Sequence, residues 1–221
     1  MGQLTQTTAE VQSNVDWHIP KTEGTGIKVD PAAPTFPWVD LIGFVQPNTS
    51  TPPTTQPSRE VFRTGVNALE YDADDEMDIV FHVPHDWVPG SDSFVHLHWA
   101  HNGTAISGDF IASINVTYSS RDGATVFPAA TTLVPISVST PDVATIPQYM
   151  HYVTEIPLTT ASPSAAEIDS DDIEVDGMFL VTVKTTTVPT ITGGHLFIFT
   201  GDIHYQSTGI GTKNNAAPFY T

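Results

Sequence analysis

Three histidines lie within fourteen residues in the stretch PHDWVPGSDSFVHLHWA, Pro84 to Ala100. His85 precedes a Gly-Ser-Asp turn, and one residue separates His96 from His98. Imidazole nitrogens bind transition metals, and two histidines two positions apart on a strand project from the same face, as a chelate requires. The stretch therefore suggests a metal site, a catalytic site or a histidine-rich surface that another subunit covers.

The elements that position these histidines are predicted to be strands. From about residue 59, apolar and polar residues alternate with a period of two, and turn residues interrupt the alternation every ten or so positions. This pattern predicts strands near 60–66, 77–83, 93–101, 109–119, 131–138, 149–157, 178–187 and 195–206. We therefore predict an all-β chain whose residues 59–206 form an antiparallel, jelly-roll-like β-sandwich.

Strand alternation assigns the histidines to the face that points away from the core. In the 93–101 strand, Val95, Leu97 and Trp99 take the core side, which leaves His96 and His98 outside. The outward set also contains apolar residues, too many for a face left in water. We predict that this face is an interface between the protomers of a homotrimer, formed by Val80, His82, Phe94, His96, His98, Leu180, Ile198 and His204.

Two metal-binding alternatives stay open beside this interface. In the first, histidines of several chains, drawn from His96, His98 and His204, converge on one structural ion at an oligomer axis. In the second, Gly90 followed by His96 and His98 begins a cupin-like metal motif. However, the carboxylate of that motif is replaced by HNGT, its second half is missing, and its ligands would have to lie inside the barrel. The primary prediction includes no metal and no cofactor.

Composition excludes several classes of function. The chain has 25 acidic residues against 7 lysines and arginines, a formal charge of −18, which repels phosphates and anionic lipids. We therefore expect no direct nucleic-acid or membrane partner. The sequence has no cysteine, no phosphate-binding glycine loop, no nucleophile elbow and no HExxH motif, and we predict no catalytic residue and no enzymatic activity.

The first 58 residues and the last fifteen differ from the predicted sandwich. Residues 1–58 are rich in proline and lack a regular period, so we expect an extended arm that anchors the protein to a neighbouring chain. Residues 207–221 form a predicted tail that contacts another chain or the sandwich. The expected contact residues are Trp17, Ile19, Phe36, Trp38, Phe44, Phe219 and Tyr220.

Two separated stretches resemble a known group of proteins. PHDWVPGSDSFVHLHW resembles the Pro-His, Gly-Ser/Thr-Asp, His-x-His-Trp pattern of virion structural proteins of tailed bacteriophages. GDIHYQSTGIGTKNNAAPFYT, residues 201–221, resembles the end of the same group. Together they cover under a fifth of the chain. The resemblance implies a β-rich virion component, assembled in the host cytoplasm, whose partners are other virion proteins.

The residues themselves favour one position on the particle. A high negative charge suits the exterior, away from packaged DNA, and an apolar-studded arm can lie between capsomers. We therefore expect a capsid decoration or cement protein that binds the major capsid protein across subunit boundaries and stabilises the head. The alternatives are a neck or tail component, such as a collar or fibre adaptor, and a cupin-like metal-binding or sugar-binding module.

Overall fold

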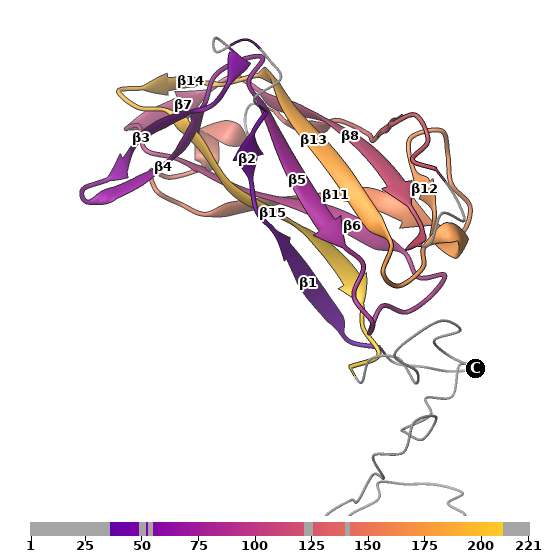
Figure 1. Cartoon of the computed structure of the whole chain (residues 1–221). Helices are drawn as coiled ribbons and strands as arrows, with labels where there is room; N and C mark the ends of the chain where they lie inside the picture. Colours follow the sequence, from indigo (N-terminus) through magenta and orange to yellow (C-terminus); the bar gives the residue numbers. More distant parts are fainter. Residues whose placement is uncertain (1–35, 49–51, 53–54, 122–125, 140–141, 210–221) are drawn as a thin grey trace, which may run out of the picture. The chain divides into compact units, whose positions relative to one another are not determined.

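Two large β-sheets packed face to face and a small two-stranded sheet make up the structure, a computed structural model that describes residues 36–48, 52, 55–121, 126–139 and 142–209 (Figure 1). All strand pairs are antiparallel except β11 with β12. This arrangement confirms the predicted β-sandwich. No helix in the described part of the chain has the length and hydrophobicity that crossing a bilayer would require.

Sheet A carries the histidine pair. Its strand order is β12, β11, β6, β15, β4 and β3, and β1 pairs with the second half of β15. Its strands are β1 (Trp38–Gly43), β3 (Ser58–Arg63), β4 (Val66–Tyr71), β6 (Ser93–His101), β11 (Tyr152–Thr160), β12 (Ile168–Asp169) and β15 (Leu196–Gln206).

Sheet B covers the inner face of sheet A. Its order is β10, β8, β13, β5 and β2, with β9 also pairing with β8. Its strands are β2 (Gln46–Pro47), β5 (Glu76–His82), β8 (Phe110–Ser119), β9 (Thr131–Thr132), β10 (Ile136–Val138) and β13 (Met178–Thr187). The remaining elements are the pair β7 (Ala105–Ser107) and β14 (Thr190–Thr192) and the short 3-10 helices η3 (Val143–Thr145) and η4 (Ser170–Asp172).

The sandwich begins earlier than the sequence predicted. Strand β1 adds to sheet A and β2 adds to sheet B, so residues 38–47 belong to the sandwich and the predicted boundary at residue 58 is wrong. The pairing partner of β1 lies more than 150 residues away, at 201–206, and no local pattern indicates it. The compact unit runs from Thr35 to Gly211. Trp17, Ile19, Phe219 and Tyr220 lie outside the described residues.

Facing glycines let the two sheets approach closely beside β1. Gly43 and Gly201 are register partners on β1 and β15, and both face sheet B. A Cβ on Gly201 would lie 2.7 Å from Ile79 Cδ1, and one on Gly43 would lie 2.3 Å from Ile79 Cγ2 and 2.5 Å from the Phe81 ring. The absence of side chains on these two residues therefore makes room for two large core residues of β5.

An irregularity in β15 changes which of its residues face the core. The pairing of β15 with β6 shifts between Ile198 and Thr200, a β-bulge that inserts Phe199. Ile198 is therefore buried in the core, and the prediction that it points outward is wrong. After the bulge, His204 returns to the outward phase, as predicted, and Asp202 shares that phase.

The predicted outward residues lie on two faces, not one. Phe94, His96, His98 and His204 lie on the outer face of sheet A, whereas Val80, His82 and Leu180 lie on the outer face of sheet B. The alternation assigns a residue to the inside or outside of its own sheet but does not say which sheet the strand joins. These residues therefore do not form one contiguous patch on the chain.

Candidate functional site

A cluster of histidines and carboxylates crosses four strands on the outer face of sheet A. His96 on β6 lies opposite Glu155 of β11 on one side and opposite Asp202 of β15 on the other. His204, two residues beyond Asp202, lies opposite Asp40 of β1. The i, i+2 spacings in both β6 and β15 bring these side chains to the same face. We call Asp40, His96, His98, His151, Glu155, Asp202 and His204 the histidine cluster.

The cluster is held together by short polar contacts. His96 Nδ1 lies 3.2 Å from Asp202 Oδ1, and its Nε2 lies 2.9 Å from Glu155 Oε2. His98 Nε2 lies 2.5 Å from Asp202 Oδ2, and its Nδ1 lies 2.8 Å from His151 Nε2. Each of these two imidazoles therefore directs one nitrogen at Asp202 and the other at a second partner.

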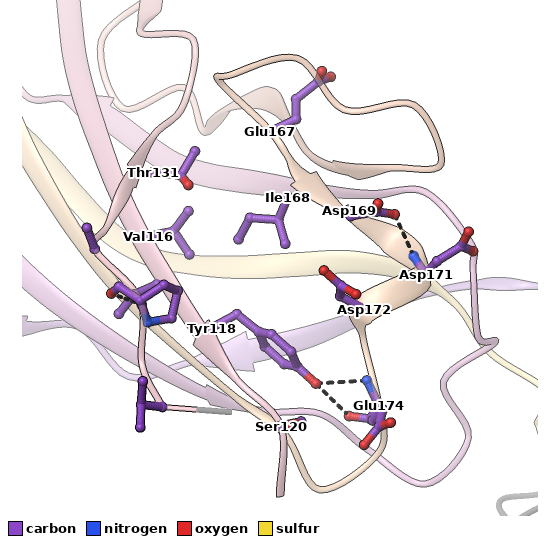
Figure 2. A pocket seen from close by; sticks show the side chains of 14 residues that line it. Val116, Tyr118, Ser120, Thr131, Glu167, Ile168, Asp169, Asp171, Asp172 and Glu174 are labelled. Carbon is purple, nitrogen blue, oxygen red and sulfur yellow. Dashed lines mark hydrogen bonds between the residues drawn. The ribbon is translucent and has the colours of Figure 1, made fainter. Parts of the chain in front are cut away.

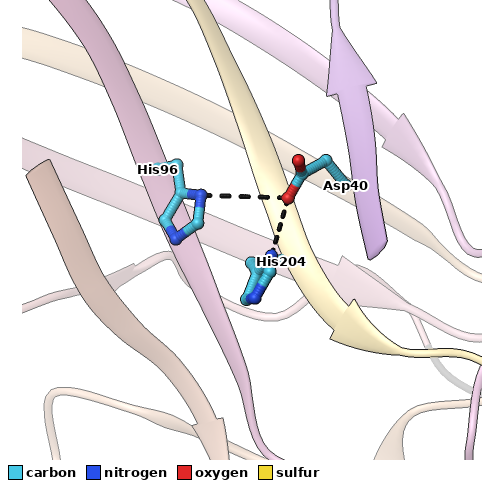
Figure 3. Close-up of side chains that lie close together, drawn as sticks. All are labelled: Asp40, His96 and His204. Atoms are coloured by element: carbon cyan, nitrogen blue, oxygen red, sulfur yellow. Dashed lines mark hydrogen bonds and ion pairs between the residues drawn. The ribbon is translucent and has the colours of Figure 1, made fainter. Parts of the chain in front are cut away.

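Asp40 joins β1 to the same cluster. Its Oδ1 lies 2.6 Å from His204 Nδ1 and 3.9 Å from His96 Nδ1, so the carboxylate lies between two imidazoles (Figure 3). The His96 and His204 rings are stacked with centroids 4.7 Å apart, and Trp38 stacks on the other side of His204 at 5.0 Å. These ring contacts fix the orientation of His204 on the sheet.

Asp202 is the buried centre of the cluster. Its side chain is only 3% exposed, and burial raises the pKa of its carboxyl above the ordinary value, although the hydrogen bond from His98 opposes this. Its Oδ1 makes no hydrogen bond to any residue that the structure describes. A buried carboxylate oxygen that accepts no hydrogen bond is costly, and the ion-pair partners of Asp202 among the described residues are the imidazoles of His96 and His98.

His82 and His85 belong to a different group. Both lie near Asp176 Oδ1, His85 at 2.8 Å and His82 at 3.4 Å, while the Arg121 guanidinium lies 3.0 Å from the other oxygen. Burial by itself would raise the pKa of Asp176, but the hydrogen bonds from His85 and Arg121 outweigh it and lower the pKa. We call this group the Asp176 cluster; it holds the end of β5 against the turn before β13.

Phe44, one of the contact residues predicted for the arm, and Ile42, which was not among them, form an exposed row at the end of β1. Ile42 is 68% exposed and Phe44 is 83% exposed, whereas Trp38 is partly covered by its contacts with His204 and Phe94. Phe36 is half-buried. Since β1 pairs only with β15 among the described strands, this row lies on an edge of sheet A.

The two stretches that carry the sequence resemblance pack against each other. The Asp86 carboxylate accepts hydrogen bonds from the Tyr205 hydroxyl, at 3.0 Å, and from the Ser207 hydroxyl. The buried Trp87 ring stacks on Tyr205 with centroids 4.8 Å apart. The Gln206 carbonyl accepts from the Val88 N–H at 3.0 Å. Residues 84–99 and 201–208 therefore form one three-dimensional unit.

A hollow of about 740 Å³ lies between β8 and the loop around η4 (Figure 2). Its described lining contains five carboxylates and no Lys, Arg or His. Tyr118 is positioned there by the Glu174 backbone, accepting from its N–H at 2.8 Å and donating to its carbonyl at 3.3 Å. Asp169 caps η4 by accepting from the Asp171 N–H. Both contacts serve the local fold, and we assign no function to this pocket.

Sequence reasoning located His96, His98 and His204 on the correct face but missed the carboxylates. No carboxylate follows His98 within the histidine motif itself, and Asp202 comes more than a hundred residues later in the chain. The repeat of an acidic or imidazole residue at alternate positions in GDIHY, Asp202 and His204, is the pattern that could have indicated it. The cupin-like alternative does not fit, because Val95, Leu97 and Trp99 fill the interior that its ligands would need.

The fold and the cluster define an all-β protein with a polar site on an outer sheet face. No family model matches the chain, and no curated protein matches it. Among solved structures, it is similar to a non-crystalline cellulose specific carbohydrate-binding module, CBM28, with 12% identity, a TM-score of 0.33 and coverage of 68% of this chain and 78% of that one.

Two further structures give weaker matches. A module named TmCBM61, solved in complex with β-1,4-galactotriose, has 11% identity and a TM-score of 0.28, with 77% of this chain and 89% of that chain covered. A CBM4 structure has 7% identity and a TM-score of 0.25, with 79% and 85% covered.

Proposed function

We propose that the chain is a virion structural protein of a tailed bacteriophage and that it decorates the head, binding the major capsid protein across capsomers without catalysing a reaction. The observation that carries a binding role is the exposed apolar row on edge strand β1. Ile42 and Phe44 cover no core, and large apolar groups left in water at a sheet edge are typical of surfaces that bind another protein.

The resemblance to virion structural proteins supports the proposal that this surface binds another protein of the phage particle. Its two matching stretches are separated by about a hundred residues, yet they form one packed unit in which Asp86 and Trp87 contact Tyr205. Because the two stretches contact each other, there is a physical reason for both sequence patterns to be present in the same protein. The charge of −18 adds support for the exterior of the head, where the protein would not compete for packaged DNA.

Copy number in purified particles tests the position. Quantitative mass spectrometry of purified virions of the phage that encodes this chain should give a copy number comparable to that of the major capsid protein. A copy number many times lower would instead indicate the neck or tail, and absence from the particles would refute a virion role.

Variants in the exposed row test the surface. Ile42→Ser and Phe44→Ser in the full chain should each weaken cosedimentation with particles lacking the protein by about tenfold or more, since each removes an apolar group buried on binding. Val61→Ser and Val66→Ser make the same kind of change at exposed valines of the β3–β4 hairpin and serve as controls. Equal binding by the row variants and the controls would refute this surface.

We also propose that the protein forms a homotrimer, through the outer face of sheet B. Val80 and Leu180 are cross-strand partners there and are both exposed, and a closed ring would bury the same patch on every copy. Native mass spectrometry of the full chain should give three copies, and Val80→Ser with Leu180→Ser should give one. A wild-type monomer would refute the trimer.

A further inference from the structure

The histidine cluster has the donor atoms and the geometry of a metal site. We propose that Asp202, His96 and His98 bind one divalent transition-metal ion, with Zn²⁺ as the reference case. One carboxylate oxygen and two imidazole nitrogens from these residues lie within 4.8 Å of one another. Imidazole together with carboxylate suits Zn²⁺, Co²⁺ or Ni²⁺, whereas Ca²⁺ and Mg²⁺ prefer oxygen ligands alone.

The nitrogens that face the carboxylate are arranged for coordination. His96 directs Nδ1 at Asp202 and can donate its Nε2–H to Glu155, and His98 directs Nε2 at Asp202 and can donate its Nδ1–H to His151. Metal-binding histidines characteristically use the second ring nitrogen to donate to such a partner, which fixes the tautomer and leaves the inner lone pair for the ion. Both imidazoles of the cluster centre have a second partner placed to accept that proton once an ion takes the inner nitrogen.

Asp202 gives the independent reason to expect a cation. Its carboxylate is almost fully buried, and Oδ1 is turned into the cluster without a hydrogen bond from any described residue. An ion there would neutralise the buried charge and bind the oxygen that accepts no hydrogen bond. Ligand atoms around tetrahedral zinc lie about 3.3 Å apart. His96 Nδ1 lies 3.2 Å from Asp202 Oδ1, which matches this value. His98 Nε2 lies 2.5 Å from the other oxygen, Oδ2, so its binding to the same ion would need a shift of the ring or of the carboxylate.

The Asp176 cluster provides a matched control. It also combines a carboxylate with two histidines, His82 and His85, but there the Arg121 guanidinium already supplies a cation to the carboxylate. A metal ion would have to compete with that permanent charge. A comparison of the two clusters therefore separates a built site from the general affinity of an acidic, histidine-containing protein for divalent ions.

Titration calorimetry of the chelator-treated full chain with Zn²⁺ at pH 7.5 tests the proposal. We expect one equivalent bound with a micromolar or tighter Kd, about tenfold or more weakened by Asp202→Asn and by His98→Gln, and unchanged by Asp176→Asn. Co²⁺ should give a visible d–d spectrum with the wild type that Asp202→Asn abolishes. If Asp202→Asn does not fold, His98→Gln decides the result.

No binding by the wild type, or site variants that bind as it does, would overturn the proposal. Equal weakening by Asp176→Asn would overturn it as well. The proposal does not depend on a virion partner, because zinc binding by the isolated chain and cosedimentation with particles are measured separately.

Discussion

Gly201→Ala tests whether Gly201 of β15 faces the core, so that the adjacent Asp202 faces outward. The added methyl would lie 2.7 Å from Ile79 Cδ1, whereas ordinary contacts of a Cβ begin near 3.4 Å, so the buried Ile79 would have to retreat. Forcing a methyl into a packed core costs about 1–3 kcal/mol. We expect a loss of about 2 kcal/mol in the free energy of unfolding, measured by urea denaturation.

A second substitution makes this prediction specific. Ile79→Val deletes Cδ1 and by itself should cost about 1 kcal/mol. Combined with Gly201→Ala, it should cost little more than it does alone, because the clashing atom is gone, and the double-mutant cycle should show a favourable coupling of about 2 kcal/mol. Gly43→Ala should gain no such rescue, since its methyl would meet Ile79 Cγ2, which valine keeps, and the Phe81 ring.

The result also bears on the metal proposal. If Gly201→Ala is as stable as the wild type, Gly201 does not face the core. The neighbouring Asp202 would then not face outward, and the geometry of the histidine cluster would be wrong.

Three other changes follow from the contacts of the sandwich. Asp176→Asn should lower the free energy of unfolding by about 1 kcal/mol at pH 7, and asparagine tolerates the left-handed backbone at φ 63°. Because the pKa of Asp176 is lowered in the folded chain, the difference from wild type should disappear as the pH falls below about 4, which acid-dependent denaturation would measure. Asp86→Ala removes the acceptor of the buried Tyr205 hydroxyl and should cost about 2–3 kcal/mol by the same assay, whereas an unchanged midpoint would contradict that hydrogen bond. Deletion of residues 1–34 should leave the cooperative unfolding of the sandwich intact, whereas deletion of residues 1–48 should destabilise the sandwich because β1 and β2 are lost. Equal stability of the two deletion variants would contradict the place of β1 and β2 in the sheets.

The sequence predicted those strands whose two faces differ in polarity. Strand β6 has the predicted bounds, because Val95, Leu97 and Trp99 alternate with polar residues and only one register buries them. In β15 the run LFIF is apolar at every position, so alternation gives no information about phase, and the bulge at Phe199 could not be foreseen. The same ambiguity caused the error at Ile198.

The sequence predicted the histidines of the candidate site but not its carboxylates, for a related reason. A histidine pair two positions apart is a local pattern, and its outward direction follows from the residues between and beside it. The carboxylates come from β15, β1 and β11, and their approach to His96 depends on which strands become neighbours and in what register. Asp40 is the clearest case, because it lies within a proline-flanked segment that was assigned to the arm.

The pairing of β1 with β15 also sets how the sandwich responds to tension. Trp38 is the register partner of Gln206, and the Ser207 N–H donates to the Pro37 carbonyl at 2.9 Å, so the chain enters β1 and leaves β15 at the same corner. A force that separates residues 36 and 208 would therefore act on the backbone hydrogen bonds between these antiparallel strands one pair after another, starting at this corner. A force applied between residue 36 and the opposite end of β15 would act along the strands and shear all of these hydrogen bonds at the same time. The same pair of strands should thus yield at a low force in the first direction and resist a much higher force in the second.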